Sequence, residues 1–398
     1  MHDSGSVAAH LGQVSVDIER SPLPAKVLDK AKLCLLDYLA AVVGGSQTAV
    51  AETGRGVLPA LGRGDCLVVG YDGTTSIVGA AFFHGLIATA DDLDDSHRFA
   101  SGLHLSAITF PAALAIGQAR GGSGSKLLRA AIAGYEIASR VCRAVDVGMR
   151  QRGFHSTGGV GPFGACTAAA STLGFDSEQT ANALRIAAST PAGLFAFLRE
   201  GASVRHAHGA WAAANGTLSA LLCESGMSGP NLAFEGEDGF LDAYAAQFEP
   251  RFLDSPVPSE SGEFEILNAY HKVYCACGHA IPAISAVLEL RPKIADRLEE
   301  IREIEVAGYR ASAALTNPNP TSPDEARFSL PFIVGLALKF GNVTKREMTM
   351  RHLRDPDVRR LACAVRVAES PQIAAAFPEV RAARVDIVMR DGASYSSY

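Results

Sequence analysis

Closely spaced helices rich in alanine and glycine are predicted along the chain from Ser21 to about Gly239. The segment 24–43 is the clearest example, because apolar residues recur three and four positions apart until Gly44 and Gly45 end the pattern. The same spacing predicts helices over 77–89, 111–119, 126–145, 164–173, 177–188 and 209–224. Helices that carry small, apolar residues on all sides are buried and pack closely. We therefore expect a layered, all-helical domain.

The sequence changes character after Glu249, where prolines and a Ser-Glu-Ser-Gly run indicate a domain junction. Beyond it, residues 303–308 and 383–390 alternate as β-strands do, and helical segments 281–290 and 330–340 lie between them. We expect a mainly α protein with a large all-helical domain over residues 1–255 and a smaller α+β domain over 256–398. A ligand site is expected in the cleft between them, since sites are common between domains.

Composition narrows the function classes. Of 398 residues, 48% are hydrophobic and 20% charged, which excludes a disordered chain. The net charge of −6 gives no reason to expect nucleic acid or an anionic membrane as a partner. No apolar run approaches the roughly 18 residues of a membrane helix, and the N-terminus does not resemble a signal peptide. The eight cysteines, mostly in apolar helical segments, suit a reducing cytoplasm.

Two motifs that suggest a cofactor lack the context they need. Gly159–Gly164 matches the dinucleotide-binding G-x-G-x-x-G string, but no strand precedes it and no acidic residue follows at the required distance. Cys275, Cys277 and His279 are ligand types for zinc, but spacings of two residues are too tight for the usual zinc loops. We expect no redox cofactor and no metal.

Acidic residues crowd the segment from Asp91 to Asp95. On a helix, three of these carboxylates would share a face and could bind Mg²⁺, although a second acidic motif is missing. A solvated acidic turn is the plainer interpretation. A third interpretation is that Asp92 or Asp95 orients the nearby His97 or His104, as carboxylates often do for imidazole rings.

Six of the eleven histidines fall in glycine-rich or polar breaks of the pattern, where a site could form. Such positions are occupied by His97, His104, His155, His206, His208 and His279. A single histidine is usually structural, but several along one domain favour a site. Just past the domain junction, Lys272 and Tyr274 could serve proton transfer or carboxylate binding.

In their order along the chain, the motifs resemble the MmgE/PrpD family. The resemblance rests on strings such as Ala31–Leu39, Asp91–His97, Gly153–Gly158, Val204–Ala213, Lys272–Cys275 and Glu325–Ser329, and it covers nearly the whole chain. It implies the two-domain fold expected above and an enzyme that acts on small polycarboxylates without a redox cofactor. The positions that match family site residues are Asp92, Ser96, His104, His155, Arg205, Lys272 and His279.

Three departures from the family pattern bear on the reaction. Arg205 stands where many relatives have lysine, and arginine binds a carboxylate well but is a poor proton shuttle. Ser329 is followed by Leu-Pro-Phe332 instead of a tyrosine, and Ser101-Gly-Leu-His104 replaces a His-Pro string. These departures favour the epimerase branch, which acts on an iminodisuccinate-like amino-polycarboxylate, over the 2-methylcitrate dehydratase and cis-aconitate decarboxylase branches.

The expected mechanism is abstraction of a proton α to a carboxylate and its return from the opposite face. His155 and Lys272 are the predicted bases, and Asp92 is predicted to orient His104 or His155. His104 is an alternative acid, and Arg205, His208, Tyr274, His279 and Ser96 are predicted to bind substrate. A hydro-lyase, a decarboxylase and a non-catalytic polycarboxylate-binding protein remain alternatives. Large apolar helical surfaces predict a homodimer.

Overall fold

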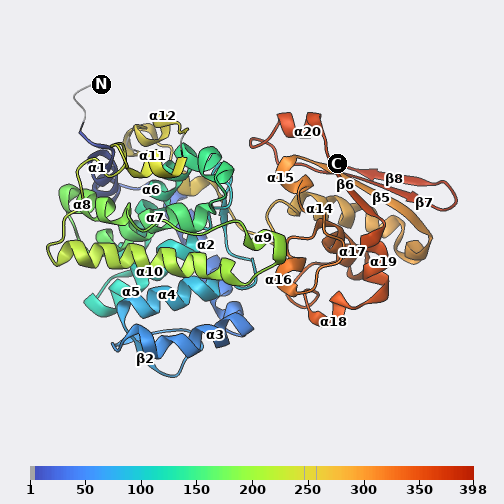
Figure 1. The fold of residues 1–398 in the computed structure, drawn as a ribbon, viewed down its shortest axis with the longest axis horizontal. Coiled ribbons are helices and arrows are strands. Elements are labelled where there is room, and N and C mark those ends of the chain that lie inside the picture. Colours follow the sequence, from blue (N-terminus) through green and yellow to red (C-terminus); the bar gives the residue numbers. More distant parts are fainter. Residues whose placement is uncertain (1–4, 246, 257) are drawn as a thin grey trace. The chain divides into compact units, whose positions relative to one another are not determined.

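The computed structural model describes residues 5–245, 247–256 and 258–398. The chain divides into two compact units (Figure 1). Unit 1 comprises residues up to Ala90, 94–196 and 204–271, and unit 2 comprises 91–93, 197–203 and 272–398. The sequence placed the boundary after residue 255, whereas unit 1 continues to His271. The extension follows from η2 (Glu265–Asn268), which packs on the long helix α6 (Gly124–Gln151).

Unit 1 is built mainly from helices, as the sequence predicts. Its remaining helices are α1 (Val7–Arg20), α2 (Ala25–Gly45), α3 (Ala49–Val57), η1 (Leu58–Leu61), α4 (Ile77–Ala88), α5 (Ser106–Arg120), α7 (Ser156–Leu173), α8 (Ser177–Ala187), α10 (Val204–Glu224), α11 (Phe240–Ala245), α12 (Pro250–Leu253) and α13 (Pro258–Ser261). Two short antiparallel pairs complete it, β1 (Cys66–Leu67) with β2 (Thr74–Thr75) and β3 (Ser96–His97) with β4 (Ala269–Tyr270).

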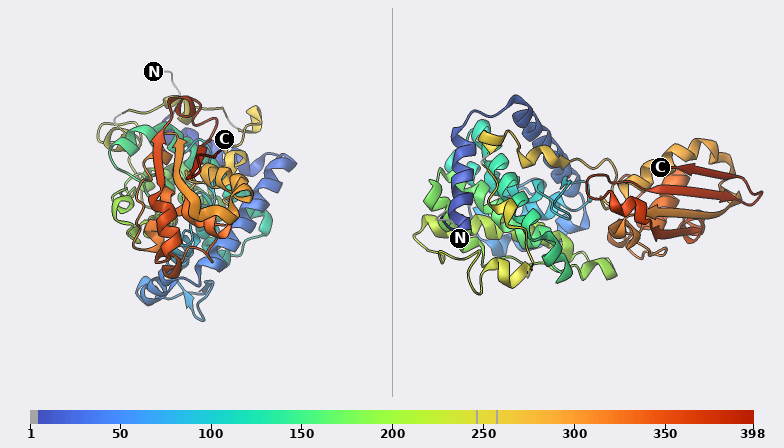
Figure 2. Two further views of the ribbon diagram at one scale, coloured as in Figure 1. Left: turned by 90° about the vertical axis from the view of Figure 1, so that its right-hand side faces the viewer. Right: turned by 90° about the horizontal axis from the view of Figure 1, so that it is seen from above.

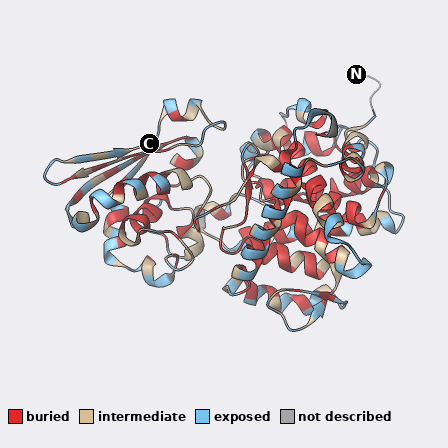
Figure 3. Ribbon diagram, turned by 180° about the vertical axis from the view of Figure 1, so that it is seen from behind, coloured by how far each residue is buried: buried red, intermediate tan, exposed pale blue. Residues whose placement is uncertain are grey.

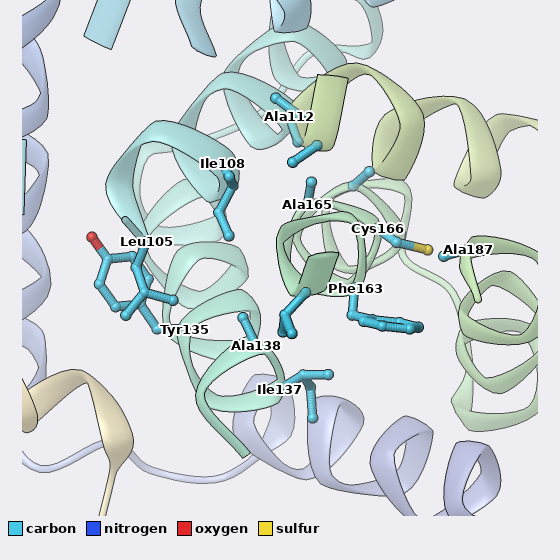
Figure 4. Packing of buried hydrophobic residues seen from close by; sticks show 14 of the residues in the cluster. Leu105, Ile108, Ala112, Tyr135, Ile137, Ala138, Phe163, Ala165, Cys166 and Ala187 are labelled. Carbon is cyan, nitrogen blue, oxygen red and sulfur yellow. The ribbon is translucent and has the colours of Figure 1, made fainter. Parts of the chain in front are cut away.

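Helix α7 lies at the centre of unit 1, where α5, α6, α8 and α10 pack around it (Figure 4). Small residues permit the close crossings: a Cβ on Gly134 of α6 would lie 2.7 Å from the carbonyl oxygen of Gly164 on α7. In the same way, a Cβ on Gly85 of α4 would lie 2.8 Å from the carbonyl oxygen of Gly209 on α10. The glycines therefore serve helix packing, and Figure 3 shows the buried residues concentrated in these inner helices.

Unit 2 is a four-stranded sheet covered by helices. The strand order is β6-β5-β7-β8, with β5 parallel to β6 and antiparallel to β7. The strands are β5 (Ile301–Gly308), β6 (Val365–Glu369), β7 (Arg384–Met389) and β8 (Ser394–Ser397). The helices are α9 (Phe197–Glu200), α14 (Ile281–Leu290), η3 (Arg291–Lys293), η4 (Ala295–Glu300), α15 (Arg310–Ala313), α16 (Pro323–Ala326), α17 (Leu330–Phe340), α18 (Met350–Leu353), α19 (Pro356–Cys363) and α20 (Pro371–Ala375).

The sheet of unit 2 buries one face, which α14 and α17 contact (Figure 2). On β7, Val385, Ile387 and Met389 are fully buried, while Arg384 is exposed and Asp386 and Val388 are only partly buried. This alternation is the period of two on which the strand prediction rested. The prediction of a mainly α fold with a smaller α+β part is therefore confirmed.

Several expected elements differ in detail from the observed ones. Helix α5 begins at Ser106 and contains Pro111, so the proline lies within the helix and does not start it. Helix α7 begins at Ser156, so the glycine-rich string Gly159–Gly164 lies inside a helix. The segment Asp91–Asp95 is not helical, and Asp92 has a positive φ of 54°. The helical Mg²⁺-binding interpretation of this segment is therefore wrong.

Within the described ranges, no single helix is both long enough and apolar enough to cross a membrane. A bent pair formed by α2 and the segment Ala49–Leu61, with 87° between them, passes the same test on length and composition.

Candidate active site

Three predicted site histidines, His104, His155 and His208, come together in unit 1. His155 immediately precedes α7, and its backbone N–H donates to the carbonyl oxygen of Gly193 at 3.0 Å. Gly193 has a φ of +100°, and a Cβ there would lie 3.2 Å from the His208 ring. A glycine is needed here because the backbone passes directly against the imidazole. His155 and His208 are both buried.

His155 and His208 share one hydrogen bond through their Nδ1 atoms, which lie 2.9 Å apart. One ring must donate a proton at Nδ1 and the other must accept it there, since two N–H groups cannot bond to each other. Burial, Arg205 and His206 lower the pKa of His208 to about 4, so this ring is neutral near pH 7. The tautomer of His208 therefore decides whether a neutral His155 carries its proton on Nδ1 or on Nε2.

His104 lies beside this pair, with its ring centroid 6.3 Å from that of His155. Its Nδ1 is 2.9 Å from Oδ2 of Asp94 and 3.1 Å from the carbonyl oxygen of Asp95. Both partners are acceptors, so Nδ1 carries the proton. Asp94 is therefore the carboxylate that orients His104 through Nδ1. The orienting role predicted for Asp92 remains a prediction.

Asp95 instead fixes the start of α5, the helix that follows the acidic segment. Its buried carboxylate accepts hydrogen bonds from the hydroxyl of Tyr135 at 2.6 Å and the backbone N–H of Ser106 at 2.8 Å. Burial raises the pKa of Asp95. These bonds fix the start of α5 relative to α6, which makes Asp95 a structural residue.

His97 also has a structural contact. Its Nδ1 accepts hydrogen bonds from the backbone N–H groups of Phe99 and Ala100, and its Nε2 lies 3.0 Å from Oε2 of Glu265. Burial opposes ionisation of Glu265, but His97 and Arg143 lower its pKa to about 2. This contact between His97 and Glu265 fastens β3 to η2. Sequence reasoning missed it because Glu265 is far along the chain and belongs to no motif.

Arg205 and His206 converge on one carbonyl oxygen, that of Thr89 at the end of α4. Arg205 Nη2 lies 3.2 Å from it and His206 Nδ1 lies 3.0 Å from it. Both residues belong to α10, so the expectation that His206 and His208 occupy a break in the helical pattern is wrong. The guanidinium of Arg205 nevertheless lies one helical turn from His208, which is close enough for both to act on one ligand.

Lys272 is buried in unit 2 and paired with Asp92. Its Nζ donates to Oδ1 of Asp92 at 2.7 Å and to the backbone carbonyl of Asp92 at 3.1 Å. The two side chains are only 1% and 2% exposed. The carboxylate of Asp92 compensates the charge of the buried ammonium group.

The chain around Asp92 is anchored by the neighbouring residue. Asp91 forms ion pairs with Arg327 at 3.2 Å and with Lys345 at 2.7 Å. Its backbone carbonyl accepts a hydrogen bond from Sγ of Cys275 at 2.8 Å, and burial raises the pKa of that thiol. Cys275 therefore acts as a hydrogen-bonded core residue here. None of these partners could be identified from the acidic string alone.

The remaining predicted residues make other contacts. Ser96 is buried in unit 1 and donates its hydroxyl proton to the carbonyl oxygen of Leu103 at 3.3 Å. In unit 2, His279 Nδ1 lies 3.0 Å from the hydroxyl oxygen of Tyr309, and Tyr274 packs at the edge of the hydrophobic core. The roles predicted for these three residues in substrate binding remain predictions.

A pocket of about 620 Å³ in unit 1 contains none of the predicted site residues. Its lining includes Glu136, Arg140, Arg143 and Glu265. The two arginines are already paired with the two glutamates, which neutralise them. The histidine group of unit 1 and the Lys272–Asp92 pair of unit 2 therefore remain the two candidate groups.

Comparison with known proteins supports the family resemblance. Residues 9–253 match the MmgE/PrpD N-terminal domain, and residues 274–397 match the MmgE/PrpD C-terminal domain. A cis-aconitate decarboxylase-like protein (oryM) of Aspergillus oryzae is 31% identical over 321 residues, which are 76% of this chain and 66% of that protein.

Other relatives carry a similar name. A cis-aconitate decarboxylase of Aspergillus terreus is 27% identical over 394 residues, covering 94% of this chain and 80% of its own length. The human cis-aconitate decarboxylase is 26% identical over 330 residues, covering 80% of this chain and 66% of its own. Since the two domain matches cover most of the sequence, the chain belongs to the MmgE/PrpD family.

Proposed function

We propose that this chain is a cofactor-independent lyase that acts on a small polycarboxylate of the cis-aconitate type. The proposal rests on one observation above all: His155 and His208 form a buried pair with one shared proton, and His104 lies beside it. Such a group can give or take a proton without a metal or a redox cofactor. The names of the related decarboxylases support the lyase class over the epimerase that the sequence favoured.

Decarboxylation of cis-aconitate needs few groups. The carbon–carbon bond to one carboxylate breaks and carbon dioxide leaves. The electron pair of that bond forms a new carbon–carbon double bond, while a carbon of the original double bond takes up a proton. His155 or Lys272 would deliver that proton. Arg205 would hold a remaining carboxylate, because a guanidinium matches the two oxygens of a carboxylate.

Epimerisation is the second candidate, and two residues favour it. Phe332, in the segment where the decarboxylase and dehydratase branches are expected to carry a tyrosine, is fully buried in the core of unit 2 and has no hydroxyl to offer. Arg205 cannot shuttle a proton at neutral pH. An epimerase would remove the proton α to a carboxylate and return one to the opposite face, with His155 and Lys272 as the two bases.

Incubation of the purified protein in D₂O with each of two substrates would separate the candidates. With cis-aconitate, a decarboxylase would release carbon dioxide and incorporate one deuterium into the product. With iminodisuccinate, an epimerase would exchange the proton α to a carboxylate and release nothing. Exchange in iminodisuccinate without turnover of cis-aconitate would overturn the lyase proposal, and tight binding of either compound without any reaction would favour a binding protein.

A further inference from the structure

Arg150 lies in the last turn of α6, beside the histidine group of unit 1. Its side chain is exposed, and its Cζ lies 3.9 Å from the centre of the Phe195 ring. The Phe195 ring meets the His155 ring edge to face, with 4.9 Å between the ring centroids. Since these two distances add at most, the guanidinium carbon of Arg150 is no more than about 9 Å from the centre of the imidazole of His155.

Backbone hydrogen bonds fix Phe195 next to His155. The N–H of Phe195 donates to the carbonyl oxygen of Gly153 at 2.8 Å, and the N–H of His155 donates to that of Gly193 at 3.0 Å. The segments that contain these residues therefore run side by side. Phe195 offers a fixed surface on which the guanidinium of Arg150 stacks, and this stacking reduces the conformational freedom that Arg150 would lose on binding a ligand.

The hydrogen-bonding edge of this guanidinium is available to an anion. Stacking occupies only the face of the group, so its N–H donors can still bind a ligand. In the part of the chain that the structure describes, Arg150 forms no ion pair. Asp146 is the acidic residue that acts on its charge, and the carboxylate of Asp146 accepts hydrogen bonds from the hydroxyl of Ser156 at 3.0 Å and the N–H of Ser101 at 3.3 Å.

We propose that Arg150 binds one carboxylate of a tricarboxylate substrate that reacts at His155. This inference rests on the proposed function, in which carbon dioxide leaves and two carboxylates remain on the product. Arg205, one helical turn from His208, can hold one of these two. The other needs a cation of its own, and Arg150 supplies a second guanidinium beside His155.

The distances suit an acid of this length. Paired hydrogen bonds between a guanidinium and a carboxylate place their central carbons about 4 Å apart. The carboxyl carbons at the two ends of an extended three-carbon chain are about 5 Å apart. An acid whose end carboxylate is held by Arg150 can therefore reach the imidazole of His155. An acid without that end carboxylate gains nothing from Arg150, so this residue selects for three carboxylates over two.

Isothermal titration calorimetry of the full chain with two saturated acids tests this subsite. Propane-1,2,3-tricarboxylate carries three carboxylates, and 2-methylsuccinate is the same skeleton with one end carboxylate replaced by hydrogen. Wild type should bind the tricarboxylate at least roughly tenfold more tightly, because a guanidinium and a carboxylate form a strong, charge-assisted contact. In Arg150→Gln this preference should disappear, while the affinity for 2-methylsuccinate changes by less than about twofold.

Arg20→Gln is the matched control, because Arg20 is also exposed in the last turn of a helix, α1, and its loss changes the net charge equally. This variant should keep the wild-type preference, and Arg150→Lys, which retains the charge without the two-pronged geometry, should keep part of it. An Arg150→Gln protein that is folded by circular dichroism and still prefers the tricarboxylate would overturn the subsite. So would an equal loss of affinity for both acids, since Arg150 would then act only through the net charge.

Steady-state kinetics separates this inference from the proposed function. Arg150→Gln should raise the KM for cis-aconitate by roughly tenfold while kcat is nearly unchanged, because the lost contact holds a carboxylate that does not react. Turnover with an unchanged KM would overturn the subsite and leave the lyase in place. If wild type does not turn over cis-aconitate, the lyase proposal fails, and the calorimetric preference for three carboxylates still decides the subsite.

Discussion

The two units bury their candidate proton-transfer groups in opposite ways. In unit 1, His155 is held by a neutral partner, His208, through a hydrogen bond between two ring nitrogens. In unit 2, Lys272 is held by a charged partner, Asp92, in an ion pair that is almost fully buried. Loss of one partner of a neutral pair leaves no uncompensated charge, whereas removal of one charge from a buried ion pair leaves the other uncompensated.

This difference predicts that the two groups will respond differently to mutation. At Lys272, loss of activity and loss of stability should come together, whereas at His155 they should separate. Positions outside apolar helix faces, where the sequence places both residues, would by themselves predict little loss of stability on substitution. The buried ion pair changes that expectation for Lys272.

The largest effect is expected for Lys272→Ala. Turnover should fall by roughly 10³-fold or more, as for loss of a general acid or base, and unfolding should become easier by about 3–5 kcal/mol. Urea denaturation and steady-state kinetics measure the two effects. The double variant Lys272→Ala/Asp92→Ala should regain much of the stability and none of the activity. A single variant as stable as wild type would show that the ion pair does not contribute to the fold.

His155→Ala should reduce turnover by roughly 10² to 10⁴-fold while the urea midpoint changes much less than in Lys272→Ala. The reason is that its partner, His208, is neutral and is not left as an unpaired charge. His155→Gln, which retains hydrogen-bonding capacity, serves as the control for structure. Turnover within a few fold of wild type in either variant would assign His155 a structural role.

The pH dependence of stability should report on His208. Its pKa is about 4 in the folded chain against about 6.5 when exposed, so the unfolded state binds more protons between these values. Stability is therefore lost as pH falls from about 6.5 to 4, by up to about 3 kcal/mol. In His208→Gln this part of the pH dependence should disappear, as measured by urea denaturation at several pH values. Equal slopes for both proteins would contradict the assignment.

The smallest effect is expected for Arg205→Lys. If Arg205 only binds a carboxylate, KM should rise by roughly tenfold while kcat is nearly unchanged, since lysine retains the charge but not the two-pronged geometry. Steady-state kinetics over a range of substrate concentrations decides this. A fall in kcat with unchanged KM would instead place Arg205 in the reaction itself.

The sequence by itself determined the helices in which apolar residues recur with a regular period. Helices α14 and α17 have the predicted bounds, and α2 and α8 differ from theirs by two residues or fewer at each end. Local spacing reveals these features because it records which face of a helix or strand is buried.

Periodicity carried less information where small residues fill whole helices. The beginning of α7 was missed because Gly159, Gly161 and Gly164 resemble a loop or a phosphate-binding motif in sequence. In the structure these glycines are needed where other helices cross α7, and a Cβ on Gly161 would lie 2.7 Å from the Cβ of Ala212 on α10. A glycine selected for close packing cannot be distinguished from one selected for a turn without knowledge of its neighbours.

Only the tertiary structure decided the partners of the polar residues. Within Asp91–Asp95, the structure pairs Asp91 with Arg327, Asp92 with Lys272 and Asp94 with His104. In the sequence these carboxylates are equivalent neighbours. They differ because the chain leaves regular helix here, with Asp92 at a positive φ, so successive side chains point to different surroundings. A buried charge needs an opposite charge close by, and packing can bring that partner from any part of the chain. No local sequence pattern indicates where the partner lies.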